Sequence, residues 1–377
     1  MLDKLSGIQP RASTALAVLV AGALIAALAA LLVARQGERE ERLKFDVAVN
    51  DAQAAIKTRI HDYADVLRGV RGLFTAMGDV RRDQFRRYIN SLDLENRFPG
   101  IQVIHFSRWI SEAERPAFES AIRGDRSLEP RGHPDFRIRP SGIRPEYVIA
   151  QYVEPMAGNE RALGLDLAGD PVRLAALERT RDSGLITASG TIVLALDPKK
   201  HPGFAMRLAI YRKDAPIATV EQRRAAFTGV VSASFVAIDL MRGVLSAPFL
   251  HDVHVQIHDA GFLDNPGGLQ RPDAENLIFD SNRLSDAAAP SQPPFPAGRL
   301  GALRSVTDLD VGGRRWQVYL SARRGFGDAL DHSLPWAVLA SGLTISLLLF
   351  GLIRSLDRKS TRLNSSHIQK SRMPSSA

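Results

Sequence analysis

The 377-residue chain contains no cysteine. A disulfide framework, a thiolate metal site and a lipid-modified N-terminal cysteine are therefore excluded. The chain also lacks the extreme composition of a disordered protein, because 45% of its residues are hydrophobic and 24% are charged. At this length, such a composition predicts a folded protein with more than one domain.

Charge is missing altogether from two long apolar runs. Residues 13–34 and residues 334–353 contain no Asp, Glu, Lys or Arg. Each run is long enough to cross the hydrocarbon core of a bilayer as a helix. We therefore predict two transmembrane helices, and a cleaved signal peptide is the alternative interpretation of the first.

Basic residues flank the outer ends of both runs. Lys4 and Arg11 precede the first run, and Arg354, Arg358 and Lys359 follow the second. The positive-inside rule then predicts a multi-pass protein of the inner (plasma) membrane. Its N-terminus (1–12) and its C-terminal tail (354–377) are expected in the cytoplasm, and the central segment in the periplasm or outside the cell.

The net charge of +8 does not indicate a nucleic acid partner. Most of the positive excess lies in the two terminal segments, so the central segment is nearly neutral. Residues 357–377 show no apolar period and resemble translated adapter sequence, with a natural basic tail on anionic lipid as the alternative. We expect this tail to be truncated or artefactual and a cytoplasmic output domain to be missing.

A stripe of hydrophobic residues follows the first apolar run. Its members recur at alternating steps of four and three, and they are Ile56, Ile60, Tyr63, Leu67, Val70 and Phe74. This spacing is typical of a coiled-coil seam and also of a helix that packs on a core. We predict a stalk helix over residues 35–92, and the sequence leaves open whether the stripe forms a homodimer, packs on the outer domain or does both.

Strand and helix patterns alternate over the rest of the central segment. Ser111 and Glu114 have the spacing of a capping box, Asp170-Pro171 is typical of a helix start, and Gly184 of a helix end. Apolar runs predict strands at 101–110, 136–140, 146–155, 191–196 and 204–211. A second set, which begins with FTGVVSASFVAI and ends in a hairpin at Gly312-Gly313, follows the polar link 212–224. The predicted fold class is α+β.

Two stretches resemble the CHASE domain, an extracellular sensor module of histidine kinases, nucleotide cyclases and diguanylate cyclases. They are FPGIQVIHFSRWISEAERPAFESAIR and FRIRPSGIRPEYVIAQYVEPMAGNERALGLDLAGDPVRLAALERTRDSG. The resemblance implies two PAS-like lobes on the stalk, a membrane-distal one at 93–211 and a membrane-proximal one at 212–333. It also implies a small ligand in the distal lobe, which in plant relatives is a cytokinin, an adenine-type hormone.

The same resemblance implies ligand-binding positions. Glu154 corresponds to the carboxylate that holds the base in the family, whereas Thr191 and Leu194 fall near the mouth and an apolar wall of the family's pocket. Tyr147 and Gln151 lie on the strand that delivers Glu154 at its end. We predict that these five residues bind an adenine-like or other heteroaromatic molecule.

A structural role is the alternative for Glu154. In that interpretation it is a turn carboxylate paired with Arg139, Arg144 or Arg161. The sequence alone does not decide between the two roles.

No catalytic or metal-binding pattern stands out in the chain. His251, His254 and His258 cannot all reach one ion if VHVQIH is a strand, so we predict no metal and no cofactor. The usual serine hydrolase, zinc protease and nucleotide-binding patterns are missing, so we predict no enzymatic activity in this region.

The sequence thus predicts a membrane-anchored sensor that signals to a histidine kinase or cyclase domain. A membrane-anchored periplasmic enzyme or a solute-binding protein is the alternative.

Overall fold

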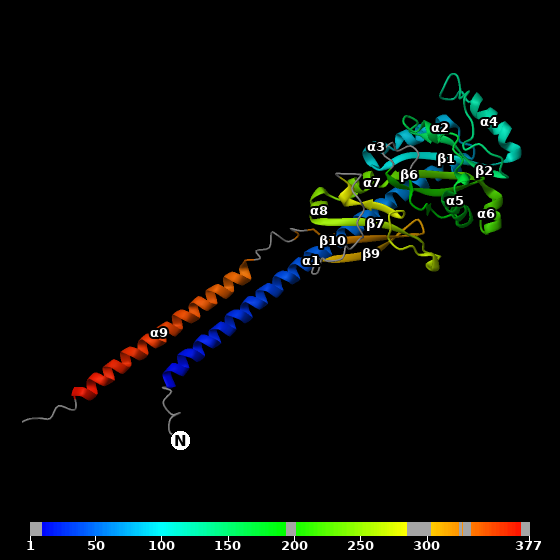
Figure 1. Ribbon diagram of the computed structural model, residues 1–377. Helices are drawn as coiled ribbons and strands as arrows, with labels where there is room; N and C mark the ends of the chain where they lie inside the picture. Colours follow the sequence, from blue (N-terminus) through cyan, green and yellow to red (C-terminus); the bar gives the residue numbers. More distant parts are fainter. Residues whose placement is uncertain (1–9, 194–200, 285–302, 324–325, 327–332, 371–377) are drawn as a thin grey trace, which may run out of the picture. The chain divides into compact units, whose positions relative to one another are not determined.

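The computed structural model describes residues 10–193, 201–284, 303–323, 326 and 333–370 (Figure 1). The chain divides into two compact units. One unit comprises residues 1–46 and 325–377, and the other comprises residues 47–324.

The first unit contains two helices that are long and apolar enough to cross a membrane, within Ser13–Met77 and Leu334–Leu356. They approach closely at two glycines. A Cβ atom added to Gly22 would lie 2.2 Å from Ser346 Oγ, and one added to Gly342 would lie 2.5 Å from Ala26 Cβ. Small residues of this kind allow membrane helices to pack backbone against backbone.

The C-terminal helix α9 (Leu334–Lys370) continues far beyond the predicted membrane span. Residues 357–370 of the tail are therefore helical, although they show no apolar period. The physical reason is that extending an existing helix requires little further ordering, and no proline or glycine interrupts this stretch.

Helix α1 (Pro10–Met77) is continuous from the first apolar run to the end of the hydrophobic stripe. The predicted stalk over 35–92 is wrong in its end, because Gly78 adopts a φ of 77° and stops the helix. All six residues of the stripe are buried within the protein's own fold, and none is more than 6% exposed. The stripe therefore packs on the outer domain and is not available as a dimer seam.

The second unit contains two antiparallel sheets. The first sheet has the strand order β2-β1-β6-β5-β3, with β4 pairing beside β3 on β5. Its strands are β1 (Ile101–Ser111), β2 (Glu146–Glu154), β3 (Thr187–Ala188), β4 (Ile192–Val193), β5 (Pro202–Tyr211) and β6 (Phe227–Val236). The predicted strands at 101–110, 146–155 and 204–211 are confirmed.

The second sheet has the order β8-β7-β10-β9. Its strands are β7 (Val253–Phe262), β8 (Leu277–Asp280), β9 (Arg304–Val311) and β10 (Arg314–Ala322). The predicted hairpin at Gly312-Gly313 is confirmed, and both glycines have positive φ values.

The other α-helices of the second unit are α2 (Arg82–Ser91), α3 (Leu94–Arg97), α4 (Arg115–Gly124), α5 (Pro171–Ser183), α6 (Val220–Ala226), α7 (Ala237–Val244) and α8 (Ala247–Asp252).

One strand prediction and one boundary prediction are wrong. Residues 136–140 form only an isolated bridge between Arg139 and Leu165. Strand β6 was expected to begin the second set, yet it lies between β1 and β5 in the first sheet, so the boundary at 211/212 is wrong. The polar link 212–224 connects two consecutive antiparallel strands, and the chain leaves the first sheet only after Val236.

The two faces of the first sheet are covered by different helices. On one face, α1 contributes Tyr63 against Phe235 and Phe74 against Phe106, with ring centroids 5.0 and 4.5 Å apart. On the other face, Leu177 of α5 forms a buried cluster with Val148 and Val230. The sheet therefore separates the stalk helix from α5.

The two sheets are joined by specific contacts within the second unit. The Ala188 amide donates a hydrogen bond to the Gly312 carbonyl at 2.9 Å, and the rings of Phe204 and Trp316 lie 4.7 Å apart. A Cβ atom at Gly312 would lie 2.5 Å from the Ala188 nitrogen. The hairpin turn thus needs glycine for close approach as well as for its φ value.

Candidate functional site

Glu154 ends strand β2 and is 3% exposed. Its neighbour two residues earlier, Tyr152, packs on Phe85 of α2, so Glu154 lies on the stalk face of the sheet. Burial raises the pKa of its carboxyl, and the positive charges of Arg86 and Arg82 oppose that effect. A ligand contact by Glu154 stays a prediction.

Two of the three ion-pair partners suggested for Glu154, Arg144 and Arg139, are engaged elsewhere. Arg144 pairs with Asp166 at 2.7 Å. Arg139 donates to the carbonyls of Arg161 and Leu163 at 2.9 and 2.8 Å. The cations that act most strongly on the pKa of Glu154 are Arg86 and Arg82 of α2. The sequence alone did not point to them.

Tyr147 and Gln151 are not brought together with Glu154. Tyr147 lies at the other end of β2, in a core cluster with Phe118 and Ile122 of α4, and its hydroxyl accepts a hydrogen bond from the Arg144 amide at 2.8 Å. Gln151 is the extra residue of a β-bulge. Its neighbours Ala150 and Tyr152 pair with the adjacent residues Ser107 and Phe106 of β1, which leaves Gln151 without a partner in the register. The bulge moves Glu154 to the same face as Tyr147, although alternation alone would separate them.

The other two predicted residues lie near the second sheet or outside the described residues. The Thr191 hydroxyl lies 3.4 Å from the Asn276 carbonyl, which precedes β8. Leu194 belongs to residues 194–200, which the structure does not describe. The five predicted residues therefore do not form one site in the described part of the chain.

The three histidines tested as metal ligands have separate partners. His254 contacts Asp280 at 2.9 Å, His258 contacts Asn276 at 2.9 Å, and His251 contacts Asp252 at 2.8 Å. Within the described ranges, no group of three His, Asp or Glu residues is arranged to hold a metal ion.

Four polar side chains line up across the middle of the first sheet. The register pairs His105 of β1 with Ser232 of β6, Ser232 with Arg207 of β5, and Arg207 with Thr187 of β3. Residues paired across strands project from the same face. None of the four is more than 5% exposed. We call His105, Ser232, Arg207 and Thr187 the polar row.

Helix α5 covers the polar row. Leu177 packs on Val230, which is two residues before Ser232 and therefore on the same face. Arg173 lies one turn before Leu177 on the same side of α5. Asp170 starts the helix by accepting hydrogen bonds from the amides of Val172 and Arg173 at 2.9 and 3.1 Å. The predicted cap therefore also places Arg173 over the row.

The electrostatics of the row are dominated by buried positive charge. Burial lowers the pKa of the Arg207 guanidinium to about 9, and the charge of Arg173 lowers it further. Nε and Nη1 of Arg207 and Oγ of Ser232 have no hydrogen-bond partner among the residues that the structure describes. Buried charges in proteins are normally paired. The row thus presents several donors for which the described chain provides no acceptor.

His105 is the second titratable member of the row, beside Arg207. Burial lowers its pKa to about 3, helped by the positive charges of Arg207 and Arg173. Its Nδ1 atom lies 3.0 Å from the Ser107 hydroxyl. Near neutral pH the imidazole is therefore uncharged and can donate or accept one hydrogen bond at each nitrogen according to its tautomer.

This arrangement predicts a pH effect on stability. The unfolded chain protonates His105 near pH 6.5, whereas the folded chain resists protonation down to about pH 3. The contribution of His105 to the free energy of unfolding is therefore fully present above pH 6.5, and it is lost as the pH falls from 6.5 towards 3. At pH 5 the loss is about 2 kcal/mol. Denaturant unfolding measures the free energy of unfolding at pH 7 and at pH 5. Between these two pH values, His105→Gln should lose about 2 kcal/mol less of it than wild type does.

His61→Gln is the matched control, because His61 is exposed on α1. It should leave the pH dependence unchanged. His133 and His258, whose pKa values are also lowered by burial, are present in all three proteins, so the difference isolates His105. An identical pH dependence in wild type and His105→Gln would contradict the prediction.

The sequence analysis missed the polar row, although a signal is present. Arg207 interrupts the apolar strand FAMRLAIY, and Ser232 and Ser234 occupy alternate positions in VVSASFV. Both strands are buried on both faces, where a polar residue at an alternate position needs a partner. Only the register shows that these residues meet His105.

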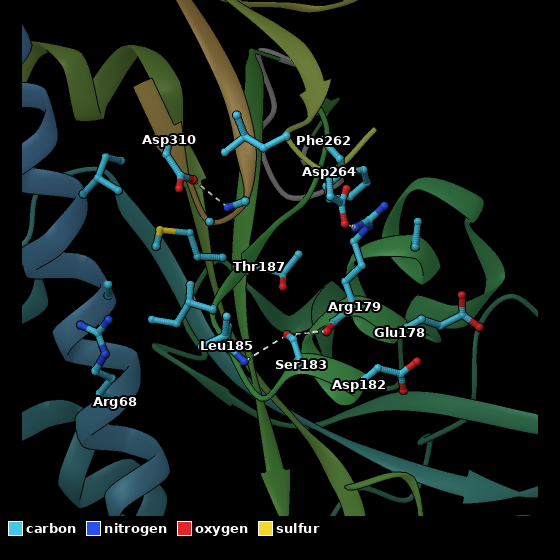
Figure 2. Close-up of a pocket in the computed structure, with 18 of the residues that line it drawn as sticks. Arg68, Glu178, Arg179, Asp182, Ser183, Leu185, Thr187, Phe262, Asp264 and Asp310 are labelled. Carbon is cyan, nitrogen blue, oxygen red and sulfur yellow. Dashed lines mark hydrogen bonds and ion pairs between the residues drawn. The ribbon is translucent and has the colours of Figure 1, made fainter. Parts of the chain in front are cut away.

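A second candidate is a groove of about 950 Å³ beside the β3 edge of the first sheet (Figure 2). It is lined by α1, the C-terminal half of α5, the turn after β7 and the hairpin of β9 and β10. Two ion pairs already occupy charged groups in its wall, Arg179 with Asp264 and Asp182 with Arg224. The polar row therefore has the stronger chemical requirement for a ligand.

Comparison with protein families gives one match that covers more than half of the chain. The family model described as the CHASE domain matches residues 78–279. The matched segment includes the whole first sheet, α5 and the polar row.

A curated relative and two solved structures are also similar to the chain. Hybrid signal transduction histidine kinase A of Dictyostelium discoideum is 22% identical over 337 residues, which cover 86% of this chain. The chain spans only 15% of the length of that relative.

The two structures are sensor domains of bacterial chemoreceptors. The periplasmic sensory domain of a Campylobacter jejuni chemoreceptor is 11% identical, with a TM-score of 0.40 over 79% of this chain and 99% of that one. The ligand-binding domain of a Pseudomonas aeruginosa amino acid chemoreceptor, in complex with GABA, is 14% identical, with a TM-score of 0.38 over 75% of this chain and 100% of that one. Both scores are too low to support conclusions about ligand binding in this chain.

Proposed function

The chain belongs to the CHASE domain family, and we propose that it is a membrane-anchored receptor whose periplasmic sensor domain binds a small molecule. In this proposal, the signal passes through the two membrane helices to a cytoplasmic output domain, either a histidine kinase or a cyclase. The family membership supports an extracellular sensor domain of a signalling receptor. The ligand, the inner-membrane location and the output domain are the proposed parts.

The polar row is the observation that carries this proposal. It lies between α5 and the first sheet, it contains unpaired buried donors, and a buried apolar cluster lies beside it. Small-molecule sites combine apolar walls with a few polar groups in this way. An enzyme would need a nucleophile or a general base close to its substrate. The histidine of the row has a pKa lowered to about 3, so it is a weak base.

We further propose that the two sheets are the cores of two PAS-like lobes. The first lobe would comprise β1 to β6 and the second β7 to β10, with the change from one to the other after Val236. The separate strand orders of the two sheets support this division.

The proposed route of the signal follows from the two faces of the first sheet. Arg207 faces α5, whereas its sequence neighbours Met206 and Leu208 face α1. A shift of β5 on ligand binding would therefore also move the packing of α1, which is one helix from Pro10 to Met77. Ligand binding must favour one of two packings if it is to signal.

The predicted homodimer stays a prediction, and its contact cannot be the buried stripe. The ligand role of Glu154, Tyr147, Gln151, Thr191 and Leu194 also stays a prediction. The adenine-like ligand was inferred from the resemblance alone, and the polar row favours a different chemistry.

A fusion protein tests the receptor function. Residues 1–356 would be joined to the catalytic domains of a histidine kinase, placed in nanodiscs and exposed to a library of small metabolites. We expect a compound that raises the melting temperature to change autophosphorylation by roughly fivefold or more, a typical allosteric coupling.

The control separates binding from signalling. Three glycines inserted after Gly37, where an added Cβ atom would meet no atom within 4 Å, should preserve the rise in melting temperature and abolish the kinase response. Stabilising compounds that never alter kinase activity in the uninterrupted fusion would refute the receptor function.

A further inference from the structure

Three arginines of the second unit are buried, and they differ in their partners. Arg314 of β10 binds Asp259 through three contacts of 2.9, 3.0 and 2.6 Å. Arg82 of α2 contacts His133 and lies in the field of Asp125 and Glu154. Arg207 is 1% exposed, and neither its Nε nor its Nη1 atom has a partner in the described ranges. Its guanidinium is therefore the least compensated of the three.

The charges around Arg207 make the deficit clear. The group with the largest Coulombic effect on it is a second cation, Arg173, and the carboxylate that acts on it is Asp170. Asp170 is 41% exposed in its side chain and is occupied as the cap of α5. Two arginines and one carboxylate leave one positive charge, since His105 is neutral. One negative charge would balance the site.

We propose that the polar row binds the carboxylate group of a small organic monoanion, with Arg207 as its main partner and Arg173 as the second cation. This inference rests on the proposed receptor function and narrows its ligand class. A guanidinium has five N–H donors in a plane and matches the geometry of a carboxylate. The unpaired hydroxyl of Ser232, next to Arg207 in the register, supplies a further donor.

The surroundings of the row suit the organic part of such a ligand. Val148, Leu177 and Val230 form a buried cluster beside the row, and Trp109 packs against it. A compact carboxylic acid with a short apolar body would place its charge on Arg207 and its body against this cluster. An adenine-type base carries no negative charge near pH 7 and would leave Arg207 unpaired.

The first experiment measures melting of the full chain in nanodiscs at pH 7 and constant ionic strength. The probes are acetate, propionate and pyruvate, their uncharged primary amides, and inorganic phosphate. We expect at least one carboxylate to raise the melting temperature in a saturable way and its amide to have no effect. Arg207→Gln should weaken that carboxylate at least tenfold, whereas Arg87→Gln, a change of an exposed arginine on α2, should not.

Several results would overturn the proposal. They are equal shifts with a carboxylate and its amide, a shift with phosphate alone, an unchanged carboxylate affinity in Arg207→Gln, and no shift with any of the three carboxylates.

The second experiment needs no ligand. If Arg207 is an uncompensated buried charge, Arg207→Met should raise the melting temperature of the protein in a buffer without carboxylates, by roughly 2–4 °C. A structural arginine would give the opposite sign. A fall in melting temperature would therefore overturn the proposal, even though the variant would also fail to bind carboxylates.

Failure of the ligand class and failure of the receptor function are distinguishable. Binding of uncharged compounds that alters the activity of the kinase fusion would reject the carboxylate and preserve the receptor. Carboxylate binding that depends on Arg207 but leaves the kinase fusion unaffected would preserve the ligand class and reject the receptor.

Discussion

Replacing Tyr63 with alanine is expected to lower the free energy of unfolding of the 47–324 unit by about 3–5 kcal/mol. Tyr63 is fully buried in α1, and its ring lies 5.0 Å from that of Phe235 and 6.2 Å from that of Phe98. Its hydroxyl donates to the carbonyl of Pro99. The change removes a large aromatic contact and leaves a cavity between the stalk helix and the first sheet.

Denaturant unfolding of the full chain in nanodiscs, followed by tryptophan fluorescence, measures this loss. Thr58→Ala, an exposed change one and a half turns earlier in α1, is the matched control and should alter stability by less than about 0.5 kcal/mol. Tyr63→Phe keeps the ring and should cost only about 0.5–1.5 kcal/mol for the hydrogen bond.

The same variant discriminates between the two roles of the hydrophobic stripe. If the stripe were a dimer seam, Tyr63→Ala would act mainly on association, and its effect on stability would depend on protein concentration. We expect a loss that is independent of concentration, because the stripe is buried within one chain. A strong concentration dependence that is present in wild type and absent in Tyr63→Ala would contradict this assignment.

The second large effect is expected at the buried ion pair of the second sheet. Asp259→Ala should destabilise the unit by about 3–5 kcal/mol, because it leaves the Arg314 guanidinium buried without its partner. Asp259 and Arg314 expose only 3% and 9% of their side chains. A Cβ atom at Gly190 would lie 3.3 Å from both groups, so the pair is also close to the junction of the two sheets.

Two further variants establish the cause of this loss. Asp264→Ala breaks the exposed pair with Arg179 and should cost at most about 1 kcal/mol. The double replacement Asp259→Leu with Arg314→Met removes both charges and should recover most of the stability lost in Asp259→Ala. A double variant as unstable as the single one would show that packing, and not the unpaired charge, is responsible.

Arg314 and Arg207 are therefore opposite cases of one physical rule. Removing the partner of Arg314 creates an uncompensated buried charge, whereas removing Arg207 itself eliminates one. The expected signs of Asp259→Ala and Arg207→Met are opposite for this reason. Measurement of both signs would support a ligand role for Arg207 and a structural role for Arg314.

The sequence by itself determined the features that depend on neighbouring residues. The capping box of Ser111 and Glu114 forms with a 2.8 Å hydrogen bond, Asp170 caps α5, and Gly184 ends it at a φ of 72°. The two apolar runs and the order of most strands were also readable, and so was the resemblance to the CHASE domain. Caps, turns and membrane spans are local, since each is decided within a few turns of chain.

The tertiary structure alone decided which segments meet. The heptad stripe fits a partner helix or a sheet equally well in sequence, and only the fold places Phe235 and Phe106 against it. Strand β6 joins the first sheet because it pairs with β5 and β1, and β1 is more than 100 residues away in the chain. The bulge at Gln151 shifts the alternation of β2 and turns Glu154 to the stalk face. The polar row arises in the same way: its four residues come from four strands, and only strand register brings their side chains to one face.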